Sequence, residues 1–155
     1  MRTVWPDLDG GRLRAPYPNA LRPTYYTVTE GDLLLSLAAT FVTSTKLGDT
    51  SLTTTYLGNV FTFPGDRRRG LGRRVVEAAS DDIRCSDVDV GALLCDPDLE
   101  PFYRSSGWVA MPEAATLTGD GAVLRGLRMI LIVSDAARTC RPRLATQPMH
   151  VPAAW

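Results

Sequence analysis

The spacing of apolar residues changes at about residue 70, and this change constrains the fold more than any other feature of the sequence. Before it, three segments rich in β-branched and aromatic residues are separated by the turn-forming stretches EGD and LGDT. These segments cover residues 23–29, 32–47 and 50–63, and they predict an antiparallel meander. From Leu71 onward, apolar residues recur every three or four positions, which predicts an amphipathic helix that ends near Cys85.

Three further segments complete the expected elements. The apolar run VDVGALLC (88–95) is typical of a buried parallel strand, and DPDLEPFYRSSGW after it predicts a short helix. The run LRGLRMILIVS (124–134) predicts a last strand. From Arg138 to Trp155 the chain has three prolines and little periodicity, so we expect an irregular tail over residues 135–155.

Length and composition favour one globular domain over residues 1–155, with its core in residues 23–134. No apolar stretch is long enough for a membrane span, and the N-terminus does not resemble a signal peptide, so we expect a cytoplasmic protein. The spacing of the three cysteines is not that of a metal site, so we expect free thiols and no bound metal. The single histidine, His150, lies in the tail, where a catalytic role is not expected.

The formal net charge is zero, but basic and acidic residues are concentrated in different segments of the chain. Residues 60–74 carry five arginines against one aspartate, whereas residues 75–120 carry ten acids against two arginines. The first block suits an anion. The second suits a cationic substrate, but a solvated acidic surface is the simpler explanation.

The segment GDRRRGLGRRVVEAA (65–79) joins a predicted strand to a predicted helix. Free backbone N–H groups and the positive end of the helix dipole gather at such a point and bind phosphate. A Walker loop is excluded because Leu71-Gly72 stands where Lys-Ser or Lys-Thr is required. A dinucleotide fingerprint fails because Val75 occupies the third glycine position. The pattern R-x-x-G-x-G over residues 67–72 remains, with a solvated loop or a nucleic-acid patch as the alternative readings.

This pattern and its surroundings resemble the GNAT superfamily of N-acetyltransferases. NVFTFPGDRRRGLGRRVVEAA is similar to the family's fourth strand, cofactor loop and third helix, and VGALLCDPDLEPFYRSSGW to its fifth strand and fourth helix. The resemblance covers about residues 23–134. It implies an α/β (α+β) fold with a mixed, mostly antiparallel sheet, splayed fourth and fifth strands and helices on both faces. Within the superfamily, the chain resembles the aminoglycoside 2'-N-acetyltransferases, which also end in tryptophan, as Trp155 does here.

The resemblance implies that acetyl-CoA is the cofactor and assigns roles to particular residues. Tyr103 would protonate the departing thiolate, as the family's general acid does. The pantetheine arm would pair with a bulged strand at Val60, Phe61 and Thr62. The cofactor's pyrophosphate would lie on Arg67, Arg68, Arg69, Gly70, Leu71, Gly72 and Arg73. The acceptor would contact Tyr56, Gly58, Asn59 and Trp155.

The sequence departs from the aminoglycoside enzymes at two places: Gly58 stands where those enzymes carry a glutamate base, and the last strand, RGLRMILIV, lacks the acid with which they hold a polycationic sugar. Only 22 residues precede the first strand, so we expect the N-terminal part of the fold to be abbreviated. The expected activity is acetyl transfer to the amine of a small molecule, without nucleic-acid or membrane partners. A non-catalytic acyl-CoA-binding module and a protein N-acetyltransferase stay open as alternatives. A homodimer stays open as the assembly that would compensate for the short N-terminus.

Overall fold

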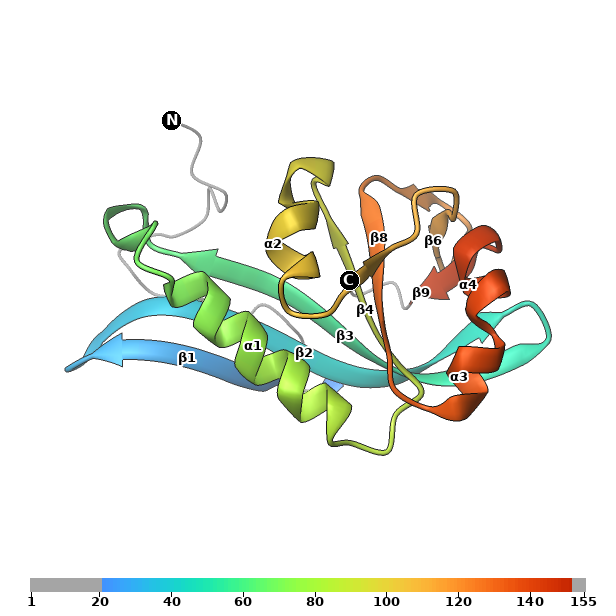
Figure 1. Ribbon diagram of the computed structural model, residues 1–155, viewed down its shortest axis with the longest axis horizontal. Helices are drawn as coiled ribbons and strands as arrows, with labels where there is room; N and C mark the ends of the chain where they lie inside the picture. Colours follow the sequence, from blue (N-terminus) through green and yellow to red (C-terminus); the bar gives the residue numbers. More distant parts are fainter. Residues whose placement is uncertain (1–20, 152–155) are drawn as a thin grey trace.

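The computed structural model describes residues 21–151, and Figure 1 shows their arrangement. The strands are β1 (Thr24–Glu30), β2 (Leu33–Leu47), β3 (Thr50–Thr62), β4 (Val90–Cys95), β5 (Val109–Ala110), β6 (Thr116–Thr118), β7 (Val123–Leu124), β8 (Leu127–Ile132) and β9 (Met149–Val151). The helices are α1 (Leu71–Arg84), α2 (Glu100–Arg104), α3 (Asp135–Thr139) and α4 (Arg141–Thr146). Two 3-10 turns are η3 (Pro64–Asp66) and η4 (Pro97–Leu99).

The predicted meander is confirmed within one or two residues at each boundary. β1 pairs antiparallel with β2, and β2 pairs antiparallel with β3. Both connecting turns place a glycine at positive φ, Gly31 at 57° and Gly48 at 58°, a conformation that other residues adopt reluctantly. The predicted helix is confirmed as α1, which buries Leu71, Val75, Val76, Ala79, Ser80 and Ile83.

Strand β4 lies parallel to β3, as the strand–helix–strand order predicts, but the two strands pair only briefly. Their register joins Thr54 to Val90, Thr55 to Gly91 and Tyr56 to Ala92, and β3 then continues beside β2 alone. The predicted bulge is present, because Gly58 faces Ala39 and Phe61 faces Leu37, which leaves two residues of β3 opposite one residue of β2. The strands therefore splay apart, as expected.

The sheet separates two cores on its opposite faces. Its strand order is β5-β8-β4-β3-β2-β9-β6-β7, and β1 lies beside β2. Adjacent residues point to opposite faces: Ala38 and Leu57 pack in the core under α1, whereas Ala39 and Tyr56 pack in the core that holds Leu144 of α4. Figure 1 shows α1 along β1–β3, with α3 and α4 at the other end of the sheet.

The C-terminal segment corrects an expectation, because residues 135–151 are ordered elements and not an irregular tail. Helices α3 and α4 lead into β9, which pairs with β2 at Lys46 and His150 and runs parallel to β6. Leu144, Met149 and Val151 are buried in the second core. Their apolar contacts fix the segment in place. The strands β5, β6 and β7 were also not predicted.

The buried side chain of Arg128 holds this segment to β8. Only 2% of Arg128 is exposed, and its Nη1 donates to the Ala115 carbonyl at 3.0 Å. Its Nη2 donates to the carbonyls of Leu144 and Gln147, the latter at 3.0 Å. Both carbonyls lie at the end of α4, where no helical N–H is available to them. Burial lowers the pKa of Arg128 to about 10, so the guanidinium remains charged at neutral pH.

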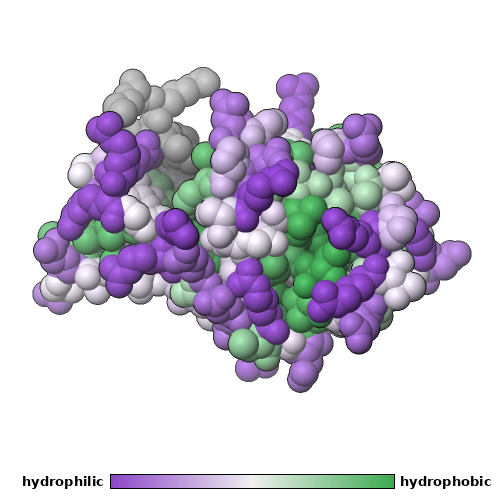
Figure 2. All heavy atoms as spheres, in the orientation of Figure 1, coloured by the Kyte–Doolittle hydropathy of each residue, from purple (hydrophilic) through white to green (hydrophobic). Residues whose placement is uncertain are grey.

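The surface seen in Figure 2 is mostly hydrophilic, and its most continuous apolar area lies over β4 and β8, between α2 and the C-terminal helices. None of the helices in residues 21–151 has the length and apolar content that a bilayer crossing requires.

Replacing Arg128 with methionine should release the C-terminal segment. Three backbone carbonyls would lose their donor inside the protein, and we expect a loss of about 2–4 kcal/mol in the free energy of unfolding. Urea denaturation measures this loss, and amide exchange should accelerate over β9. The matched control is Arg125→Met, since Arg125 is exposed. Equal stability of the two variants would contradict the assigned role.

Candidate functional site

A groove opens where β3 and β4 separate. One edge of β3 past Gly58 pairs with β2, through Phe61 to Leu37 and Thr62 to Ser36. The other edge has lost β4 as its neighbour, since the last pair between these strands is Tyr56 to Ala92. The backbone groups of an unpaired edge are available to an extended ligand.

The groove continues over the loop that leads into α1. Gly70 caps the helix in the left-handed conformation at φ 76°, and Arg68 in the same loop also has a positive φ of 64°. The Nε of Arg67 donates to the Thr62 carbonyl at 3.2 Å, which ties the loop to the end of β3. Arg69 forms an ion pair with Asp66 in the same loop.

The first turn of α1 presents backbone donors to the groove. The first amide bonded inside the helix is that of Arg74, which donates to the Gly70 carbonyl at 3.1 Å. The amides of Leu71, Gly72 and Arg73 have no carbonyl within the helix to accept their protons. Gly70 has no side chain to cap them, and the helix dipole adds positive potential at this end. This arrangement suits a phosphate group.

A side chain at residue 72 would crowd this turn. A Cβ built on Gly72 would lie 3.1 Å from Thr62 Oγ1 and 3.7 Å from Phe102 Cζ. The same loop contains Gly65, where a Cβ would meet nothing within 4 Å. The need for glycine is therefore specific to the helix turn that lines the groove.

Tyr103 of α2 closes the opposite side of the groove. Only 7% of the residue is exposed, and its ring packs edge-on against Phe102 with 4.9 Å between the ring centroids. Burial, with a smaller contribution from Cys95, raises the pKa of Tyr103 above its usual range. The hydroxyl is therefore protonated at neutral pH. It makes no hydrogen bond to any residue in 21–151, which leaves its proton available to a ligand.

These features meet in one cavity of about 590 Å³. It is lined by Val60, Phe61, Thr62, Arg67, Arg68, Gly70, Leu71, Gly72, Arg73, Leu99, Phe102 and Tyr103. All but two of these residues were predicted as site residues from the sequence. The two that sequence reasoning missed, Leu99 and Phe102, stand four and one positions before Tyr103. Leu99 could have been found, because the spacing of four residues to Tyr103 puts both side chains on one helix face; Phe102, directly before Tyr103, had no such signal.

Several predicted site residues do not line the cavity. Tyr56 is fully buried in the core on the other face of the sheet, where its hydroxyl lies 2.6 Å from Thr45 Oγ1. Gly58 and Asn59 form the bulge just before the groove, with Asn59 at a φ of 52°. Arg69 is directed to Asp66. Trp155 lies outside the described residues.

The fold is shared with solved acetyltransferase structures. A GNAT family N-acetyltransferase (YhbS) from Escherichia coli in complex with CoA aligns at a TM-score of 0.56 and 13% identity, over 78% of this chain and 62% of that one. A GNAT family acetyltransferase from Brucella melitensis in complex with acetyl-CoA aligns at 0.50 and 18%, over 70% and 56%. A probable N-acyltransferase from Enterococcus faecalis V583 aligns at 0.50 and 19%, over 57% and 22%.

This chain spans less than two thirds of the length of each of these three proteins. No protein-family model matches the sequence, and no curated protein matches it either. The structural likenesses confirm the GNAT acyltransferase fold that the two sequence motifs predicted. A closer likeness to aminoglycoside enzymes is not among these findings.

Proposed function

We propose that this chain, whose fold is that of the GNAT N-acetyltransferases, uses acetyl-CoA to acetylate the amine of a small molecule. The proposal rests on one observation: a single cavity joins the free edge of β3, the first turn of α1 and the hydroxyl-bearing face of α2. These three parts match the three parts of the cofactor, which are an amide-containing arm, a pyrophosphate and a thioester. Two of the structural neighbours were solved with CoA or acetyl-CoA, which supports this choice.

The residues present fit such a cofactor. The edge of β3 at Val60, Phe61 and Thr62 would pair with the amides of the arm. The amides of the first turn of α1 would hold the pyrophosphate, with Arg67 and Arg68 lining the same wall. Gly72 leaves the space that this close approach needs. When bound, acetyl-CoA would supply an activated acetyl group, which the chain must orient towards the amine.

Tyr103 is the proposed proton donor to the departing thiolate. Its raised pKa makes complete proton transfer less favourable than for an ordinary tyrosine. The hydroxyl would therefore contribute first as a hydrogen-bond donor, which stabilises negative charge on sulfur as it develops. Gly58 offers no carboxylate at the position of the aminoglycoside enzymes' base. The acceptor would then be an amine that is already neutral, or one that loses its proton to water.

Two measurements made side by side test the proposed activity. Free-thiol release from acetyl-CoA is followed with a panel of small amines and with peptides that carry an N-terminal or lysine amine. Acetyl-CoA binding is measured separately by calorimetry. Turnover with small amines supports the proposal, and turnover with peptides alone would replace it with protein acetylation. Binding without any turnover would identify an acyl-CoA-binding module, and the absence of binding would overturn both readings.

Replacing Gly72 with valine should weaken acetyl-CoA binding at least tenfold, because the new side chain would fill the approach to the helix amides. Calorimetry measures the dissociation constant. Gly65→Val is the matched control, because a side chain there meets open space in the same loop. Unchanged affinity in a folded Gly72→Val protein would remove the phosphate-loop assignment.

Replacing Tyr103 with phenylalanine deletes the hydroxyl and keeps the ring that packs against Phe102. We expect kcat to fall by roughly 10²–10⁴, the usual contribution of general acid catalysis, while acetyl-CoA affinity changes little. Activity is measured with saturating acceptor. The variant should also depend more steeply on the leaving-group pKa across acyl-thioester analogues. Equal kcat values for the two proteins would show that Tyr103 only packs.

The ten acids of residues 75–120 are the basis for expecting a cationic acceptor, although none of them is among the residues that line the cavity. Because salt screens such attraction over about 8–10 Å, the KM of the amine should rise with ionic strength. Steady-state kinetics at several salt concentrations, with acetyl-CoA kept saturating, measures this dependence. A preference for neutral or anionic acceptors would contradict it.

A further inference from the structure

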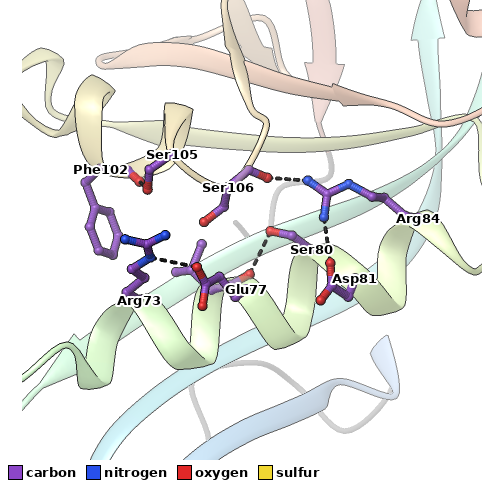
Figure 3. Close-up of polar contacts among 9 residues, drawn as sticks. Arg73, Glu77, Ser80, Asp81, Arg84, Phe102, Ser105 and Ser106 are labelled. Carbon is purple, nitrogen blue, oxygen red and sulfur yellow. Dashed lines mark hydrogen bonds and ion pairs between the residues drawn. The ribbon is translucent and has the colours of Figure 1, made fainter.

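Two side chains of α1 hold the turn that follows α2, as Figure 3 shows for one of them, Arg84. Arg84 Nη2 donates to the Ser106 carbonyl, and its Nη1 donates to Asp81 Oδ1 at 2.7 Å. One helical turn earlier, Ser80 Oγ accepts the indole N–H of Trp108 at 2.9 Å. The same hydroxyl donates to the Val76 carbonyl at 2.6 Å, so its proton and one of its lone pairs are both used.

The ring of Trp108 is confined between these contacts and β4. Trp108 is 1% exposed, and Ser80 is fully buried. On the β4 side, a Cβ built on Gly91 would lie 2.9 Å from Trp108 Cη2, closer than real Cβ contacts allow. The glycine therefore makes the space for the ring, and the Ser80 hydroxyl fixes its orientation within that space.

The backbone of this turn leads directly to Tyr103. The amides of Ser106 and Trp108 donate to the Tyr103 carbonyl, at 3.0 and 3.4 Å. Helix α2 has only five residues, which is too short to be stable without tertiary contacts. The position of Tyr103 therefore depends on what holds the residues around it, and Trp108 is the largest side chain among them.

From these contacts we infer that Ser80 and Trp108 are positioning residues that aim Tyr103 at the groove. The inference rests on the proposed function, in which Tyr103 donates to the thiolate. Helix α1 then has two tasks: its first turn lines one wall of the groove, and its third turn sets the position of α2 in the opposite wall. The distance between the phosphate site and the proton donor is fixed through a single rigid element.

Ser80→Ala and Trp108→Phe test this inference, because they delete the same hydrogen bond from opposite partners. Each should lower kcat roughly tenfold through misplacement of Tyr103, while acetyl-CoA affinity stays within about twofold of wild type. The decisive readout is the double variant with Tyr103→Phe. Once the hydroxyl is gone its position no longer matters, so Ser80→Ala should then change kcat by less than about twofold.

Thr45→Val is the matched control, since it also deletes a buried hydroxyl that bonds to an aromatic residue, in the other core. Its kcat should equal that of wild type at a temperature where all variants are folded. Multiplicative losses from Ser80→Ala and Tyr103→Phe would overturn the positioning role, and so would wild-type kcat in folded Ser80→Ala. An unchanged kcat in Tyr103→Phe alone would instead remove the proton-donor assignment, and the positioning role would fall with it.

Discussion

The brevity of the contact between β3 and β4 determines most of what this molecule can do. Two parallel strands that start side by side would normally stay paired, because each has a full row of backbone donors and acceptors. Here a bulge at Asn59, at a φ of 52°, turns β3 away after three residue pairs. The backbone N–H and C=O groups on this edge of β3 past Tyr56 have no hydrogen-bond partner in β4. A ligand with its own amide groups is the partner that such an edge accepts best.

The elements that could be predicted are those whose signal is local. Segments rich in β-branched and aromatic residues predicted β1–β3, and helical spacing from Leu71 predicted α1, because each pattern lies within the element itself. The C-terminal elements were missed for the opposite reason. They are short, and their anchor, Arg128, lies 16 and 19 residues before the two α4-end carbonyls that it binds. Backbone carbonyls leave no trace in a side-chain pattern, so the sequence showed only an arginine in an apolar strand.

The same distinction between local and long-range signals applies to the residues of the site. Glycines and arginines at a strand–helix junction predicted the residues that line the loop end of the groove, because the physical chemistry of helix termini does not depend on the rest of the fold. Tyr56 could not be placed in this way. It faces Phe41, and Phe61 faces Leu37 on the same side of β2, so the bulge reverses the side-chain alternation between them. One added residue moves every later side chain to the other face, so the bulge that Gly58 predicted also decides which residues of β3 share a face with Tyr56.

The position of β9 has a consequence for how the chain folds. Lys46 of β2 meets His150 of β9 across about 100 residues of intervening chain. Among residues 21–151, the buried members of the core under α1 include none beyond β8, whereas the opposite core also requires Leu144, Met149 and Val151. As the polypeptide leaves the ribosome, the groove side of the sheet can therefore be completed first. On the other face, Phe41 and Ile130 lack these partners until α4 and β9 emerge, and during that interval a chaperone or another chain can bind there.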